Sequence, residues 1–286
     1  MKLIGTGAAE AIPNPFCDCS ICENARQTGG RENRTRSSLQ VTPALHIDYN
    51  PDIYHQALQH NLHLHDLRHI LLTHTHCDHF AIDQLGLREM GNDQHPEPLC
   101  LHLSPAAYDW AQHYYHSLGV STVTQSPNTF HVHDLAYHRF PFHETQTIES
   151  YQITPFRGNH FGEGKDENAA NYLICDGTTI TYYATDTGMF LEETFQALAA
   201  HTIDTLIMEC TFGDNRLPPN AGHLDCYSFA KVVEHLYKQG TLHSNSHVYT
   251  THINHKHTLT YAKMVEWFAA HPLPVPVTVG YDGLDV

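Results

Sequence analysis

Short strand-like runs alternate along the chain with amphipathic helical stretches, without an internal repeat or a long linker. Apolar residues that alternate with polar ones predict strands, whereas apolar residues spaced three and four apart predict helices. The predicted strands are residues 39–49 (a pair of strands, or one strand bent at Pro43), 69–73, several runs within 130–174, 178–185, 205–208, 247–251 and 275–279. The predicted helices are residues 51–62, 81–90, 105–118, 191–200, 226–239 and 260–270.

The order of these elements predicts the class of fold. Strand meanders and β-α alternation occur in both halves of the chain, which indicates an α/β protein with two sheets packed face to face and helices outside. A length of 286 residues permits one large domain or two smaller ones. Polar side chains that could bind a ligand or take part in a reaction directly follow the predicted strands. Loops at such positions present reactive groups on a rigid scaffold.

The composition limits the classes of partner that the protein is expected to bind. Hydrophobic residues make up 41% of the chain, which is enough for a core, and no apolar run is long enough to span a membrane. The 15 basic and 31 acidic residues give a net charge of -16, which disfavours nucleic acid because phosphate backbones are repelled. An anionic substrate must therefore be attracted locally, for example by metal ions. Because the first residues lack a signal-like apolar segment, we expect a cytoplasmic protein.

Four potential metal ligands lie directly after the predicted strand 69–73, in the order His-x-His-x-Asp-His. Imidazole is a good ligand for zinc, manganese or iron, and carboxylate suits harder ions. Four ligands within six residues cannot all close comfortably on one ion. The spacing favours two ions, with His74 and His76 on one, and Asp78 and His79 on the other.

This arrangement resembles the signature of the metallo-β-lactamase fold. The resemblance implies a four-layer αββα sandwich with the metal ions at one edge, and three further ligands downstream. His160, Asp186 and His252 occupy the matching positions, each near the end of a predicted strand. By the same resemblance, one ion is bound by His74, His76 and His160, the other by Asp78, His79 and His252, and Asp186 bridges the two. We expect both ions to be zinc or manganese.

A second candidate metal site lies near the N-terminus. Cys17, Cys19 and Cys22 form a Cys-x-Cys-x-x-Cys cluster, which supplies three of the four thiolate or imidazole ligands that a structural zinc needs. His255, three residues after His252, is the candidate fourth ligand and would tie this loop to the active site. The alternatives are three unrelated thiols or a redox pair.

The cysteine cluster and the late His-x-x-His resemble the cyclic phosphodiesterase family of the carbon–phosphorus lyase pathway, with the accessory proteins of coenzyme PQQ as looser relatives. The resemblance extends over essentially the whole chain. It includes Gly5-Thr6-Gly7, the strand at 44–48 and the closing residues 279–283. It implies a single domain over residues 1–286, with a zinc-binding loop at about 13–26. It also implies hydrolysis of a small cyclic phosphodiester such as a phosphoribosyl cyclic phosphate, and it leaves a homodimer open.

His223 is the candidate general acid, because the expelled alkoxide needs a proton and this histidine matches the family's catalytic position. Together with Asp78 it completes the set of candidate catalytic residues. The polar segment 162–168 after His160 is expected to form a flexible flap beside the site. The other histidines, among them His63, His65, His113, His116, His131 and His133, match no motif, and most of them are expected at the surface.

Other readings of the same ligands remain open. An enzyme of this fold with a lactone, a thioester or an RNA 3′ end as substrate is one alternative, and the acidic charge disfavours RNA. A redox di-iron protein is disfavoured, because proteins of that kind carry glutamate where this chain has His76. A non-catalytic histidine-rich metal-binding protein is the alternative from another class, and it would hold many weakly bound ions.

Overall fold

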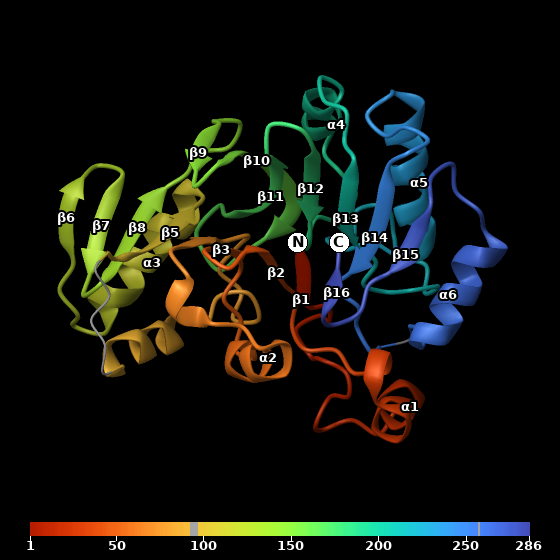
Figure 1. Cartoon of the computed structure of the whole chain (residues 1–286), viewed down its shortest axis with the longest axis horizontal. Coiled ribbons are helices and arrows are strands. Elements are labelled where there is room, and N and C mark those ends of the chain that lie inside the picture. The colour runs from red at the N-terminus through yellow and green to blue at the C-terminus, as the bar shows by residue number, and fades with distance from the viewer. Residues whose placement is uncertain (92–96, 257) are drawn as a thin grey trace.

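The computed structural model describes residues 1–91, 97–256 and 258–286. In this part of the chain the strands form two mixed sheets (Figure 1). The first sheet has the order β16 (Leu284–Asp285), β1 (Lys2–Gly5), β2 (Ser38–Thr42), β3 (Leu45–Ile47), β4 (His69–Leu71), β5 (Leu99–Leu103), β8 (Leu135–Arg139), β7 (Thr129–Val132) and β6 (Val123–Ser126). The second has the order β15 (Val277–Val279), β14 (His247–Thr251), β13 (Thr205–Glu209), β12 (Ile180–Ala184), β11 (Asn168–Cys175), β10 (Tyr151–Phe161) and β9 (Gln146–Ile148).

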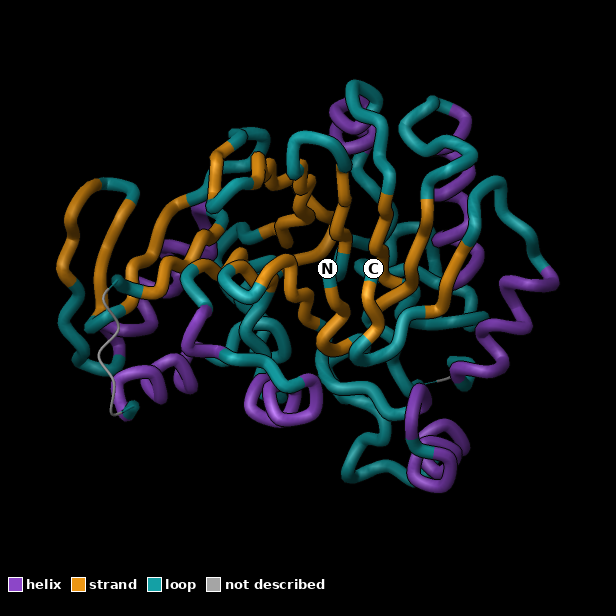
Figure 2. The backbone as a smooth tube through the Cα atoms, in the orientation of Figure 1, coloured by secondary structure: helices purple, strands orange, loops and turns teal. Residues whose placement is uncertain are grey.

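Helices cover the outer faces of both sheets, and Figure 2 shows them around the central strands. The α-helices are α1 (Ser20–Thr28), α2 (Ile53–His60), α3 (Pro105–Ser117), α4 (Glu192–Leu198), α5 (Cys226–Lys238) and α6 (Tyr261–Ala270). The short 3₁₀ segments are η1 (Gly30–Glu32), η2 (Leu64–Asp66) and η3 (Ile82–Met90). No helix in the described ranges is long and apolar enough to cross a membrane.

Three apolar layers define the sandwich. One layer joins α3 to the first sheet through residues such as Tyr108 and Leu101. A second lies between the two sheets, where Leu71 and Tyr172 are fully buried. The third joins α4, α5 and α6 to the second sheet. Four layers separated by three cores confirm the αββα architecture predicted from the sequence.

Helix α5 illustrates how the sequence sets these layers. Asp225 caps the helix: its side chain accepts a hydrogen bond from the Ser228 backbone N–H, and the Ser228 hydroxyl accepts one from Asp225 in return. The apolar residues Phe229, Val232 and Leu236 then recur at helical spacing and are fully buried against the second sheet. The capping pair thus fixes where the helix begins, and the apolar stripe fixes which face is covered.

The two sheets meet just before residues 74–79. The Tyr172 hydroxyl of β11 donates a 2.5 Å hydrogen bond to the Leu72 carbonyl, and the Ala170 amide donates a 2.7 Å bond to the Thr73 carbonyl. Both sheets contain parallel strands, β3-β4-β5-β8 in the first and β12-β13-β14-β15 in the second. Loops at the carboxyl ends of such strands commonly form ligand sites.

Two local expectations were incomplete, and one strand was not predicted. Residues 82–90 are helical, but they form a 3₁₀ helix and not an α-helix, with only Ile82 and Leu85 buried. The cysteine loop expected at 13–26 becomes helical from Ser20, because Cys22 and Ala25 bury one face of α1. Strand β1 was not predicted, because it has no alternation of apolar and polar residues: both Leu3 and Ile4 are fully buried.

Candidate metal centre

Residues 74–79 follow β4 as a tight loop. His79 and Phe80 donate backbone hydrogen bonds of 3.0 and 2.9 Å to the His76 carbonyl, which turns the chain back on itself. His74 and His79 are fully buried. The His74 Nε2 and His76 Nδ1 atoms lie 2.9 Å apart. The loop therefore directs several nitrogen atoms into one interior space.

The second sheet contributes three more side chains to this space. His160 lies in β10, and its Nε2 atom is 3.4 Å from His76 Nδ1. Asp186 follows β12, and its Oδ2 atom is 2.7 Å from His79 Nε2. His252 follows β14, and its Nε2 atom is 3.0 Å from Asp186 Oδ2. The structure thus brings all seven candidate ligands together from two sheets.

These side chains divide into two groups with Asp186 between them. The ligand atoms of His74, His76 and His160 lie within 4.8 Å of one another, and so do those of Asp78, His79 and His252. Asp186 Oδ1 lies 3.7 Å from His160 Nε2, while Oδ2 faces His79 and His252. A carboxylate whose two oxygens face different groups has the arrangement of a bridging ligand.

Several atoms at the centre are buried without a hydrogen bond of acceptable geometry. Among the described residues these include His79 Nε2, Asp186 Oδ2 and His252 Nε2. Buried polar atoms normally have partners, so three convergent atoms without hydrogen bonds indicate a missing ligand. Nitrogen and carboxylate donors at such short separations fit divalent metal ions.

The ionisation behaviour of the site agrees with this fit. Burial alone would lower the pKa of His252, but the negative charge of Asp186 outweighs it and raises the pKa to about 10. Burial likewise opposes ionisation of Asp186, but nearby histidines, His252 first, hold its pKa well below the ordinary value. The buried carboxylate of Asp186 is therefore stabilised by positive charge beside it. A bound metal cation would supply this charge while the imidazoles stay neutral.

Asp48, at the end of β3, holds one ligand in place. Its fully buried carboxylate accepts a 2.7 Å hydrogen bond from His79 Nδ1 and further bonds from the amide and hydroxyl of Thr73. This contact leaves His79 Nε2 directed at the centre, as in many carboxylate–histidine–metal arrangements. Sequence reasoning did not assign this role, since the only signal was a single acidic residue after a short strand.

Glu209 supports the other side of the centre. Its fully buried carboxylate accepts hydrogen bonds from the amides of Thr187 and Gly188, which hold the turn after Asp186. It also accepts a 2.9 Å bond from His223 Nδ1. Burial opposes its ionisation, but the His223 charge lowers the pKa of Glu209 to about 2. This residue was also missed, because it lies at the end of β13 without any motif.

His223 lies beside the centre. Its Nδ1 atom is 3.4 Å from Asp186 Oδ1, and its ring centre is 4.7 Å from that of His160. Burial lowers the pKa of His223, but Glu209 more than offsets this effect, so that the pKa is raised above the ordinary value. A half-buried, readily protonated imidazole here has the properties of a proton donor.

The backbone adopts unusual conformations at three of these positions. Asp48, Asp186 and His252 have φ angles of 65°, 46° and 56°, in the left-handed region that L-residues avoid. Gly188 follows with a φ of 54°, and a Cβ atom there would approach the Ala221 carbonyl to 2.9 Å. Strained conformations of this kind concentrate at functional sites, where the surrounding structure enforces them.

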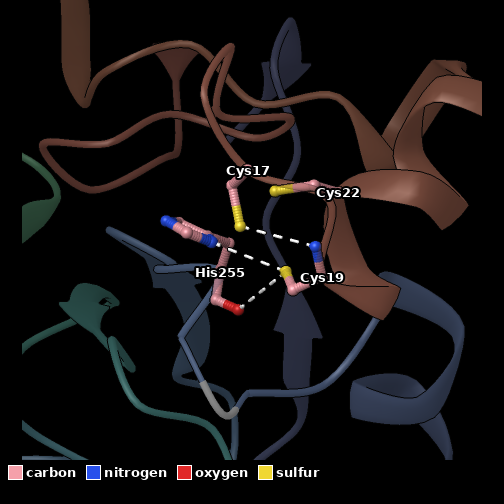
Figure 3. A group of neighbouring side chains, drawn as sticks. All are labelled: Cys17, Cys19, Cys22 and His255. Atoms are coloured by element: carbon pink, nitrogen blue, oxygen red, sulfur yellow. Dashed lines mark hydrogen bonds between the residues drawn. The ribbon is translucent and has the colours of Figure 1, made fainter.

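The cysteine cluster forms a second convergent group. Figure 3 shows Cys17, Cys19 and Cys22 directed toward His255, and the four ligand atoms lie within 4.8 Å of one another. Cys19 Sγ is 3.6 Å from His255 Nδ1. Burial opposes the Cys19 thiolate, but hydrogen bonds from the Cys22 backbone and His255 lower its pKa to about 6. Three sulfurs and one imidazole are a tetrahedral zinc donor set.

The segment after His160 differs from the expected flexible flap. Glu167 is buried, and its carboxylate accepts hydrogen bonds from the Thr75 amide at 2.8 Å and the Gly164 amide at 2.7 Å. The segment is therefore anchored to the ligand loop.

Of the extra histidines named above, all are exposed except half-buried His131, whereas His46 and His102 are buried within the first sheet.

Comparison with known proteins identifies the family. Residues 44–253 match the Beta-lactamase superfamily domain. No curated protein matches the chain. Among solved structures, a diphosphatase of the PhnP family is 20% identical, with 99% of this chain and 94% of that chain covered and a TM-score of 0.68.

Two further structures show the same fold. Zn²⁺-bound PqqB from Methylobacterium extorquens is 19% identical, with coverage of 100% and 99% and a TM-score of 0.71. The short form of human tRNase Z is 14% identical, with coverage of 99% and 98% and a TM-score of 0.60. The family match extends over well over half of the chain and includes every ligand of the candidate centre. The chain therefore belongs to the beta-lactamase superfamily and is a metal-dependent hydrolase of the metallo-β-lactamase fold.

Proposed function

We propose that the protein is a dinuclear phosphodiesterase that hydrolyses a small, in particular cyclic, phosphodiester. One divalent ion, zinc or manganese, would bind His74, His76 and His160. The other would bind Asp78, His79 and His252, with Asp186 bridging both. The observation that carries the proposal is the position of His223, which lies 3.4 Å from the proposed bridging carboxylate with one ring nitrogen held by Glu209.

When bound, two divalent ions supply charge that offsets the phosphoryl oxygens and lower the pKa of a water nucleophile toward neutrality. His223 would then donate a proton to the alkoxide that leaves. Because Nδ1 is bonded to Glu209, the proton would come from Nε2. Glu209 acts as a positioning residue, since its carboxylate orients the imidazole and favours its protonated form.

The substrate class has support from the fold relatives and from charge. The similar structures include a diphosphatase and a tRNase Z by name, which supports a substrate of the phosphoester kind. The net charge of -16 disfavours long RNA, so a small phosphodiester fits this chain better than a transfer RNA precursor. We also propose that residues 1–286 act as one domain.

The proposal is tested by hydrolysis of an aryl phosphodiester, the matching phosphomonoester and a lactone by zinc- or manganese-loaded protein. We expect diester cleavage to exceed monoester and lactone cleavage. Lactone cleavage alone would contradict the proposed phosphodiester substrate and assign a lactone in its place. Absence of all three activities, together with many weakly bound ions per chain, would favour a metal-binding protein instead.

Asp48→Asn should weaken metal binding without removing a ligand. The amide cannot accept the His79 hydrogen bond as strongly, so the ring is less well oriented and less basic. We expect metal affinity to fall about 10- to 100-fold, measured by competition with a chelator. Unchanged metal affinity would show that Asp48 contributes to packing and not to the orientation of His79. Asp52→Asn, which affects a half-buried aspartate paired with Arg36, is the matched control.

We further propose that Cys17, Cys19, Cys22 and His255 bind a structural zinc. Cys19→Ser should then remove one tightly bound zinc per chain and lower the free energy of unfolding by about 3 kcal/mol, because loss of a metal site is among the most destabilising changes. Metal analysis and denaturant unfolding provide the measurements. Cys100→Ser, outside the cluster, should keep the full zinc content; equal zinc contents in both variants would contradict the assignment.

A further inference from the structure

A pocket of about 440 Å³ adjoins the loop that carries the first four ligands of the centre. Thr75 and Cys77, the two neighbours of His76 in the chain, line it together with residues 80–84, two side chains of α3 and Glu163. The Glu163 Oε1 atom lies 3.9 Å from His76 Nε2. None of the described lining residues comes from the loop that contains the proposed proton donor. The pocket therefore borders the His76 end of the centre, and we call it the His76 pocket.

One wall of the His76 pocket is aromatic. Trp110 and Tyr114 lie one helical turn apart on α3, and their rings are stacked with centres 5.3 Å apart and planes 19° apart. The buried ring of Phe80 lies 6.1 Å from that of Trp110. The Tyr114 hydroxyl donates a hydrogen bond to Asp83, which joins this wall to η3. Because Trp110 is held by these neighbours and is only half-buried, part of its ring is open to a ligand.

The facing wall is formed by the segment after β10. The Glu163 amide donates a 2.9 Å hydrogen bond to the Thr75 hydroxyl. A Cβ atom at Gly164 would approach the Ala106 carbonyl to 3.0 Å, so the segment lies directly against the start of α3. Since both walls are fixed by contacts, the pocket is already formed before a ligand arrives, and little conformational freedom is lost on binding.

The charge of the His76 pocket is negative. Among its described lining residues the charged ones are Asp83 and Glu163, and both are exposed carboxylates. Lys165, in the same segment as Glu163, does not line the pocket. In a chain with a net charge of -16, two carboxylates at the mouth of a pocket repel a second anionic group. A neutral or cationic group meets no such repulsion.

We propose that the His76 pocket binds a planar aromatic group, neutral or cationic, that belongs to the part of the diester which stays on phosphorus. The inference rests on the proposed phosphodiesterase function and specifies its substrate class. An aromatic ring gains from offset or edge-to-face contact with Trp110 beyond the burial of its area, and a cation on that ring is attracted by the carboxylates. Trp110 and Glu163 are accordingly the residues that determine specificity at this end of the centre.

The first test compares phenyl 4-nitrophenyl phosphate with cyclohexyl 4-nitrophenyl phosphate, which share a leaving group and differ in whether the remaining ring is planar. Trp110→Leu should lower the ratio of their kcat/KM values about 5-fold, chiefly through KM. The intrinsic reactivities of the two diesters are the same for every variant and cancel in this comparison. Trp110→Phe keeps a ring and should restore most of the ratio. Tyr54→Leu, at an exposed aromatic of α2, is the matched control, and an unchanged ratio in Trp110→Leu would overturn the proposal.

The second test changes the charge on the remaining phenyl ring. We expect the wild-type protein to prefer a 4-trimethylammonium substituent over a 4-carboxylate, and Glu163→Gln to reduce this preference about 3-fold. Glu266→Gln removes the same charge from an exposed position of α6 and should leave the preference unchanged. Equal preferences in both variants would show that only the net charge of the protein acts, and would overturn the role of Glu163.

A binding measurement separates the pocket from the phosphodiesterase function. Phenylphosphonate and cyclohexylphosphonate contain a carbon–phosphorus bond and are not hydrolysed, so they report on the pocket without turnover. The chain has two tryptophans, and Trp267→Phe leaves Trp110 as the remaining indole fluorophore. We expect phenylphosphonate to bind this metal-loaded variant about 5-fold more tightly than cyclohexylphosphonate and to change its fluorescence. Equal affinities, or unchanged fluorescence, would overturn the aromatic site. Preferred binding of the phenyl compound without cleavage of any diester would support the site and reject the reaction alone.

Discussion

Asp186→Asn should lower kcat by at least about 1,000-fold, because it removes the carboxylate that faces both groups of ligands. One oxygen of Asp186 lies 3.7 Å from His160, and the other lies 2.7 Å from His79 and 3.0 Å from His252. An amide keeps the size of the side chain but lacks the negative charge that two adjacent cations require. We therefore expect the metal content of the centre to fall from two ions per chain toward one.

Two measurements check this expectation on the same sample. Elemental analysis counts the ions, and turnover of an aryl phosphodiester gives kcat. The zinc that we propose for the cysteine cluster should remain, and its retention would show that the variant is folded. Asp285→Asn, an exposed aspartate paired with Lys2, should change neither quantity. Retention of both ions and of activity would show that Asp186 is not the bridging ligand.

His223→Ala should slow hydrolysis about 1,000-fold when the leaving group is an alkyl alkoxide, but less than about 10-fold when it is 4-nitrophenoxide. A poor leaving group needs a proton as the bond to phosphorus breaks, whereas nitrophenoxide is stable without one. The ligand atoms of His160, Asp186 and His223 also lie within 4.8 Å of one another. His223 is nevertheless assigned to proton donation and not to either ion, because its Nδ1 atom is held by a 2.9 Å hydrogen bond to Glu209. Metal content should therefore be unchanged.

The decisive quantity is the ratio of the rate losses that His223→Ala causes on the two substrates. Equal losses on both would exclude general acid catalysis and would indicate a role in binding or in metal support. Glu209→Gln provides an independent check, because it leaves the imidazole in place but removes the charge that raises its pKa. It should show the same dependence on leaving group with a smaller loss. His113→Ala, at an exposed position of α3, should affect neither substrate.

The parts of the site that were predictable from sequence are those encoded locally. His74, His76, Asp78 and His79 lie so close in sequence that their spacing alone indicated two ions. The cysteine cluster is equally local. His160, Asp186 and His252 are distant in sequence, and they were identified through the order of ligands in a resembling fold rather than through any pattern of their own.

The supporting carboxylates show where sequence reasoning ends. Asp48 and Glu209 each stand alone at a strand end, and only packing brings them to His79 and His223. The same limit explains the fold. Amphipathic α5 and the alternating strands were predicted, whereas β1, buried on both sides, had no polar face to reveal it. The left-handed backbone at Asp186 and His252 is likewise set by tertiary contacts.

The division of the ligands between two sheets has a consequence for folding. The contact between Leu72 and Tyr172 joins residues 100 positions apart, and the centre can form only after both sheets have docked. Such distant contacts slow folding, because a long loop must close before they contribute. Ions that bind only the docked state stabilise it by mass action, by about 2.7 kcal/mol at a free concentration 100 times the dissociation constant. We therefore expect the supply of metal to affect the stability of the folded enzyme as well as its activity.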